Sequence, residues 1–87
     1  MGGVNFEGGS WEDYVYWQNQ DERTVDKINA LIKDILHNGN DGIGNPKLYD
    51  LSGKWSRHID EKNRLIYQIL PNDEITIYRC KGHYSDK

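Results

Sequence analysis

Three short runs of strand-forming residues fill most of the second half of the chain, and their close spacing limits the possible folds. The runs lie at residues 54–59, 64–70 and 74–80, and only a few turn-forming residues separate them. Parallel strands need a crossover of a dozen or more residues, whereas antiparallel strands can follow one another through a tight turn. The three runs are therefore predicted to form an antiparallel meander, and Val4–Phe6 can supply a further strand.

Two amphipathic segments precede these runs. Aromatic and apolar residues share one helical face over residues 11–19, and Ser10, with an acid three residues later, has the spacing of a capping box. Asp21 can cap a second helix, in which apolar residues recur every three or four positions from 25 to 36. Gly39 is then suited to end that helix. The pattern predicts a helical hairpin.

The chain is expected to form one domain over residues 1–87 with an α+β fold. Its hydrophobic content of 36% and three tryptophans suffice for a single core. Residues 39–53 are rich in Gly, Asn, Asp and Pro, so they are predicted to form a loop. The expected architecture is a two-helix hairpin packed on a small, mainly antiparallel β-sheet.

Composition also indicates a compartment. No apolar run is long enough to cross a bilayer, and no basic-then-apolar leader opens the sequence. The single cysteine, Cys80, cannot form an internal disulfide, which suits a reducing environment. These features predict a cytoplasmic protein without a membrane partner.

The net charge of −3 is unevenly distributed. Residues 1–44 contain eight acidic and three basic side chains, whereas residues 45–87 contain eight basic and six acidic ones. Such an asymmetry can give one face a positive potential despite an acidic total. It is consistent with a nucleic-acid partner, although shifts of this size also arise by chance.

Candidate reactive side chains gather near the ends of the strand-like runs. Arg57 and His58 precede the first turn of the predicted meander, Arg64 follows it, and His83 and Tyr84 follow the last run. Histidines, tyrosine and fixed positive charge suit attack on a phosphodiester. The strand register decides whether Arg57 or His58 shares a face with Arg64. The alternative interpretation is a solvated hairpin end whose charges prevent edge-to-edge aggregation.

Metal and cofactor sites are not predicted. The scattered histidines and single cysteine lack the spacing of metal ligands. The glycines at 42–44 are not followed by the rest of a phosphate-binding loop.

Several motifs resemble one family in order and spacing. They are Trp11-Glu-Asp-Tyr-Val-Tyr-Trp17, Lys27-Ile-Asn-Ala-Leu-Ile-Lys-Asp34, Gly42-Ile-Gly-Asn-Pro46, Leu51-Ser-Gly-Lys-Trp-Ser-Arg57, Asn63-Arg-Leu-Ile-Tyr67 and His83-Tyr84. From about residue 11 to residue 84, the chain resembles the YoeB/Txe family of bacterial toxins, within the RelE-like superfamily.

The resemblance implies a ribosome-dependent endoribonuclease that cuts mRNA in the A site, inhibits translation and is neutralised by a YefM-like antitoxin. It also implies toxin–antitoxin hetero-oligomers, with a homodimer as a further option. By matched position, Arg64 resembles the phosphate-stabilising arginine, His83 the general acid and Tyr84 a substrate-orienting tyrosine. Among the other bases, Arg57, Lys47 and Lys54 are candidates for RNA binding. No metal or other cofactor is implied.

The chain departs from the family pattern at two positions. The family usually has a second arginine where this chain has His58, and a glutamate that resembles a general base where it has Lys47. We hypothesise that His58 replaces this base, because neutral imidazole accepts protons near pH 7. Asp50 is the nearest acid, but it would need a realigned loop. The alternative is a catalytically attenuated or inactive antitoxin-binding module.

Overall fold

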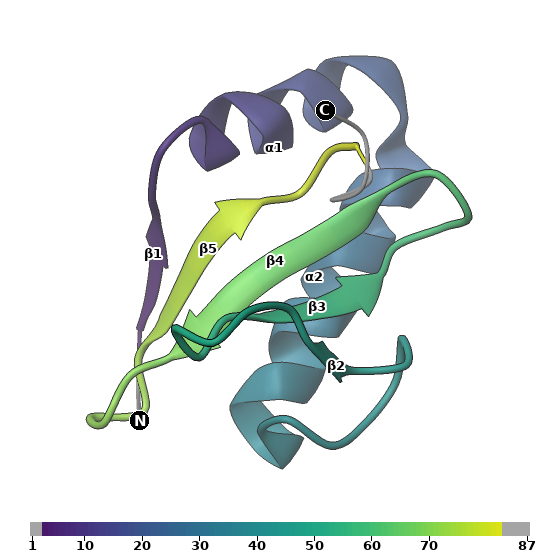
Figure 1. Cartoon of the computed structure of the whole chain (residues 1–87). Coiled ribbons are helices and arrows are strands. Elements are labelled where there is room, and N and C mark those ends of the chain that lie inside the picture. Colours follow the sequence, from purple (N-terminus) through teal and green to yellow (C-terminus); the bar gives the residue numbers. More distant parts are fainter. Residues whose placement is uncertain (1–2, 83–87) are drawn as a thin grey trace.

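A five-stranded mixed sheet with two helices on one face forms the architecture (Figure 1). The structure is a computed structural model, and it describes residues 3–82. The elements are β1 (Val4–Phe6), α1 (Ser10–Gln20), α2 (Glu22–Asn38), β2 (Lys47–Leu48), β3 (Trp55–His58), β4 (Arg64–Ile69) and β5 (Ile75–Arg79). The predicted α+β fold, with a helical hairpin on a mainly antiparallel sheet, is confirmed.

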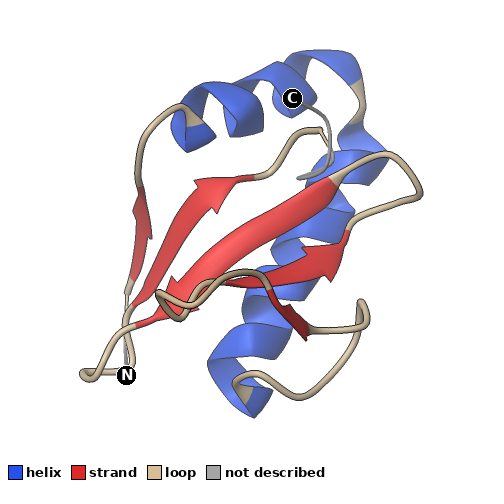
Figure 2. Cartoon of the chain, in the orientation of Figure 1, coloured by secondary structure: helices blue, strands red, loops and turns tan. Residues whose placement is uncertain are grey.

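The strands lie in the order β1-β5-β4-β3-β2. Strands β3, β4 and β5 form the antiparallel meander that their spacing predicted, and β1 joins the edge by pairing parallel to β5. Helix α2 passes behind the sheet in Figure 2 and α1 lies along its upper end, so neither helix covers the front face. Among the described residues, no helix has the length and apolar character needed to cross a membrane.

The core lies between α2 and the sheet. The apolar stripe of α2 buries Ile28, Leu31 and Ile35 against strand residues that include Leu65 and Tyr67. Side chains alternate between faces along a strand, so β4 directs its odd-numbered residues into this core and its even-numbered residues to the other face. This alternation determines which side chains can reach a ligand on the helix-free face.

The two helix starts differ from each other. Asp21 caps α2 as predicted, because its side chain accepts a hydrogen bond from the Arg23 amide. Ser10, however, is not the cap of α1: the cap residue is Gly9, and Ser10 is buried as the first helical residue. Its hydroxyl donates instead to the Ile77 carbonyl, at 2.8 Å. A distant strand therefore takes the hydrogen bond that a local capping box would have used.

The segment predicted as a loop contains the short edge strand β2, which pairs with β3. Before this strand, the backbone of Gly44 packs closely against β3, and the Gly44 carbonyl accepts a hydrogen bond from the His58 amide at 2.7 Å. Gly44 has φ of 79°, and an added Cβ would lie 2.8 Å from Leu31 Cδ2. Only glycine fits this approach without strain.

Candidate active site

The helix-free face of the sheet carries His58 and Arg64 side by side. Strands β3 and β4 pair with His58 opposite Arg64 and with Arg57 opposite Leu65. Directly opposite residues of an antiparallel pair share a face, and Leu65 belongs to the core beneath the helices. The register thus places His58 on the same face as Arg64 and turns Arg57 toward α2, which answers the question that the sequence left open.

The Arg64 side chain is held by the turn that joins β3 to β4. It is 7% exposed, and its Nη1 donates to the carbonyl oxygens of Asp60 and Asn63 at 2.5 and 3.1 Å. Within residues 3–82 Arg64 forms no ion pair with a carboxylate. Its charge is therefore oriented by carbonyl dipoles, the Asp60 carboxylate attracts it without forming a salt bridge, and this arrangement suits an anionic ligand.

The Asp60 carboxylate organises this turn. It accepts hydrogen bonds from the backbone amides of Lys62 and Asn63 and from the Asn63 side-chain amide. Burial opposes ionisation of Asp60, but these hydrogen bonds outweigh it and lower the carboxyl pKa. The ionised carboxylate keeps the turn, and with it Arg64, in a fixed geometry at neutral pH.

The chain returns to this turn after β5. The Gly82 carbonyl accepts from the Arg64 amide at 2.9 Å, and the Gly82 amide donates to Asn63 Oδ1 at 2.8 Å. The predicted site residues His83 and Tyr84 directly follow Gly82 in the sequence but lie outside the described residues. The described part of the chain therefore ends in contact with Arg64 and Asn63.

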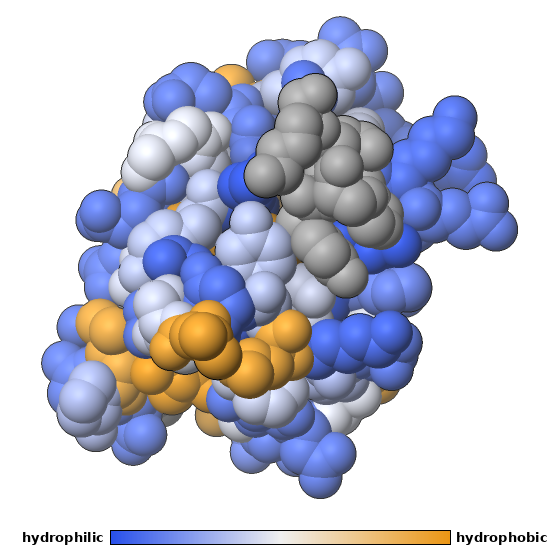
Figure 3. All heavy atoms as spheres, in the orientation of Figure 1, coloured by the Kyte–Doolittle hydropathy of each residue, from blue (hydrophilic) through white to orange (hydrophobic). Residues whose placement is uncertain are grey.

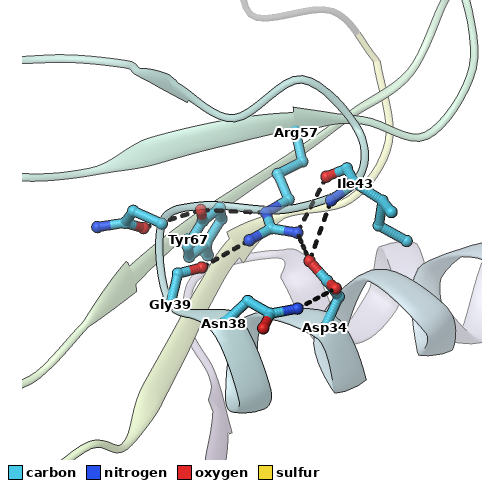
Figure 4. Close-up of polar contacts among 7 residues, drawn as sticks. Asp34, Asn38, Gly39, Ile43, Arg57 and Tyr67 are labelled. Atoms are coloured by element: carbon cyan, nitrogen blue, oxygen red, sulfur yellow. Dashed lines mark hydrogen bonds and ion pairs between the residues drawn. The ribbon is translucent and has the colours of Figure 1, made fainter.

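Arg57 lies inside the protein (Figure 4). Its side chain is 0% exposed and forms an ion pair with Asp34 of α2. The guanidinium also donates to the carbonyls of Gly39 and Ile43 at 2.6 and 2.9 Å, and to the Tyr67 hydroxyl at 3.3 Å. This placement contradicts the prediction that Arg57 contacts RNA, because an enclosed guanidinium cannot reach a phosphate.

The Arg57 network secures the loop after α2. The hydrogen bond from Arg57 is the main cause of a lowered pKa at Asp34, whose carboxylate also accepts from the Asn38 side chain and the Ile43 amide. Burial raises the pKa of Tyr67, whose hydroxyl donates to Asn40. The network fixes residues 39–43 against α2 and the sheet.

The two lysines proposed to bind RNA lie toward the β2 edge of the sheet. Lys47 is exposed and lies opposite Ser56, which shares the face of His58 by strand alternation. Lys54 lies 4.7 Å from the centre of the Tyr78 ring and 3.8 Å from the Asp50 carboxylate. Both ammonium groups lie at the surface, and RNA contact by either one stays a prediction.

Asp50 does not fill the position of the missing glutamate. Its carboxylate accepts from the Ser52 amide and hydroxyl, and from the Lys54 amide. The hydrogen bond from the Ser52 hydroxyl is the main cause of its lowered pKa. A carboxylate bound in this way stabilises its own turn and is a poor proton acceptor.

The helix-free face is largely hydrophilic in Figure 3, apart from an apolar area in the lower part of the view. Exposed apolar side chains of the chain include Leu48 at 55% and Leu51 at 101%. Within residues 3–82, no group of three or more His, Cys, Asp and Glu side chains could hold a metal ion. The polar groups described on this face include the imidazole of His58 and the guanidinium of Arg64.

Comparison with known proteins shows the family. The model of the YoeB-like toxins of bacterial type II toxin-antitoxin systems matches residues 6–84. Toxin YoeB of Escherichia coli strain K12 is 47% identical over 77 residues, which cover 86% of this chain and 90% of that protein.

Solved structures show the same similarity. The heterotetrameric YoeB–YefM toxin–antitoxin complex of Staphylococcus aureus contains a chain that is 39% identical, with a TM-score of 0.86 over 97% of this chain and 99% of that one. The YoeB dimer of the same organism is 40% identical, with a TM-score of 0.88 over 95% and 98% of the two chains. The chain therefore belongs to the YoeB-like toxins of bacterial type II toxin–antitoxin systems.

Proposed function

We propose that this toxin is a ribosome-dependent endoribonuclease that cleaves mRNA in the A site and thereby inhibits translation. The observation that carries the proposal is the pairing of His58 with Arg64 on the helix-free face, at the place where the chain returns through Gly82. A proton acceptor and a fixed cation thus lie beside the turn to which the described chain returns at Gly82. Family membership supports this assignment, and it requires no metal.

The proposed reaction cleaves RNA by internal transfer. The 2′-oxygen loses its proton and attacks the adjacent phosphorus, while the bond from phosphorus to the 5′-oxygen breaks. The products are a 2′,3′-cyclic phosphate and a 5′-hydroxyl. Arg64 stabilises the charge on the phosphoryl oxygens, His83 protonates the leaving 5′-oxygen, and Tyr84 orients the substrate. Each acid or base step typically contributes about 10²–10⁴-fold.

His58 is the proposed general base. It lies on the face of Arg64, whereas Lys47 takes the position of the family glutamate and Asp50 is engaged in its own turn. Lys47 and Lys54 are proposed to contact RNA phosphates. Arg57 has no direct part in this proposal, because its guanidinium is buried.

The test is cleavage of mRNA on programmed ribosomes by the wild-type chain and by His83→Ala, Arg64→Ala and His58→Ala. His37→Ala is a matched control, since this histidine lies exposed in the last turn of α2. We expect each site variant to lose about 10²-fold or more in cleavage rate and the control to match the wild type. Near-normal cleavage by His58→Ala would refute its role as base.

A second candidate function is that of an attenuated or inactive module that binds an antitoxin. The substitution of lysine at the position of the family glutamate favours it, because a lost general base can cost about 3–5 kcal/mol of barrier. A folded wild-type chain that leaves mRNA uncut on the ribosome would establish this alternative.

A YefM-like antitoxin is the proposed partner in both cases, and the complex is proposed to be a hetero-oligomer. A disordered acidic segment that folds onto the basic second half of the chain would block the site. A homodimer of the free toxin is proposed as well, by similarity to the staphylococcal dimer. Because its substrate would be mRNA on the translating ribosome, we propose a cytoplasmic location.

A further inference from the structure

Side chains of α1 form hydrogen bonds with the backbone at the end of β5. The Trp17 indole donates from Nε1 to the Cys80 carbonyl at 2.8 Å, and the Cys80 amide donates to Asp13 Oδ2 at 3.2 Å. Ser10 binds the Ile77 carbonyl slightly earlier along the same strand. Both backbone groups of Cys80 are thus satisfied by a helix that lies more than 60 positions away in the sequence.

On its other side, the segment 80–82 forms hydrogen bonds with the turn between β3 and β4. Asn63 Oδ1 accepts from the Gly82 amide, while the Asn63 side-chain nitrogen donates to both carboxylate oxygens of Asp60 at 3.1 Å. The Arg64 amide binds the Gly82 carbonyl. One asparagine therefore joins the end of the described chain to the turn that orients the Arg64 guanidinium.

Gly82 adopts a conformation that directs the chain between these two anchors. Its φ is 85°, and an added Cβ would lie 2.7 Å from Arg79 Nη2. Backbone with positive φ is accessible to glycine at little cost. The conformation of Gly82 is consequently held by contacts on both sides of residues 80–82.

We propose that Trp17, Asp13 and Asn63 are positioning residues for RNA cleavage, because they hold the backbone of residues 80–82 beside Arg64. This inference rests on the proposed function and deepens it. The three side chains do not touch the reacting atoms; they act through the backbone that carries His83. His83, the proposed general acid, follows Gly82 directly in the sequence, and consecutive Cα atoms are about 3.8 Å apart.

The positioning role predicts a loss in kcat with little change in KM. Misplacement of a reacting group by about 1 Å can cost on the order of 10²-fold in rate, whereas KM should change little because the three side chains bind groups of this chain itself. We expect Trp17→Phe and Asn63→Ala to lower kcat about tenfold to a hundredfold and to leave KM within about twofold. Trp11→Phe is the matched control, because Trp11 lies on the same helix and is 51% exposed.

A second readout needs no ribosome. The backbone order parameter of Gly82, measured by NMR relaxation in the full-length chain, should fall from about 0.85 to below about 0.6 in Trp17→Phe and Asn63→Ala but not in Trp11→Phe. Unchanged order at Gly82 would overturn the anchoring. Lower order at Gly82 with wild-type kcat would overturn the positioning role.

The two readouts also separate this inference from the proposed function. If the wild-type chain fails to cut mRNA, the proposed function fails, and the order parameter alone then decides whether the anchors hold. A parallel fall in kcat and thermal stability in both variants, with Gly82 still ordered, would mean that these side chains serve only the fold.

Discussion

Replacing Arg57 with methionine tests whether this arginine serves the fold or the substrate. Methionine fills similar space but offers no donor, so the carbonyls of Gly39 and Ile43 lose their partner inside the protein. Hydrogen bonds to charged groups contribute about 1.5–3 kcal/mol each, and breaking a buried ion pair costs about 3–5 kcal/mol. We therefore expect Arg57→Met to lower the free energy of unfolding by about 3–5 kcal/mol.

This loss is large for a chain of 87 residues. A domain of this size has a total stability of about 4–13 kcal/mol, and 1 kcal/mol shifts its Tm by about 4–8 °C. Arg57→Met should thus melt at least about 12 °C below the wild type. Lys47→Met is the matched control, because Lys47 is exposed and should change stability by no more than about 0.5 kcal/mol.

Urea unfolding followed by circular dichroism measures both variants. A midpoint for Arg57→Met that gives a stability within about 0.5 kcal/mol of the wild type would refute the structural assignment. If Arg57→Met kept the full stability of the wild type but no longer cleaved mRNA, the guanidinium of Arg57 would have to reach the substrate after a rearrangement.

Two further predictions concern the loop after α2. The pKa of Asp34 is lowered from its usual 3.8, so the stabilising effect of the ionised carboxylate is complete above that value and is lost as the pH falls through the folded-state pKa. Acid unfolding of Asp34→Asn should therefore depend less steeply on pH below about 4 than that of the wild type. An identical acid profile for the two proteins would contradict this role. Gly44→Ala should lower the free energy of unfolding in urea by about 1–3 kcal/mol, because of the positive φ and the contact with Leu31. Gly3→Ala is the control, because an added Cβ there would lie no closer than 3.9 Å to its nearest neighbour, and its stability should stay near that of the wild type. Equal stability of the two variants would sink this argument.

The sequence predicted the sheet well because the relevant signals are local. Short turns between strand-like runs allow only antiparallel pairing, and the apolar stripe of α2 is regular over its whole length. The two-residue strand β2 was missed since so short an element has no periodicity. The Ser10 cap was wrong for a different reason: its partner, Ile77, lies 67 positions away, and a local pattern cannot reveal such an acceptor.

The candidate site was harder to predict, because it depends on register. A shift of one residue between β3 and β4 would exchange the faces of Arg57 and His58, and the sequence could not fix that register. The anchoring role of Asn63 was also missed. The available signal was the position of Asn63 in the polar turn that begins with Asp60. Its partner, Gly82, comes close only when β5 is packed beside β4.

Strand alternation separates stability from chemistry within two adjacent residues. Arg57 faces α2 and joins the loop to the core, so its loss should damage the fold before it affects any reaction. His58 faces the other way, toward the side of the sheet that carries Arg64. A change of residue at position 58 therefore alters the helix-free face and leaves the Arg57 network intact. The same geometry explains how a proton acceptor can arise on β3 at the chain position next to a buried ion pair.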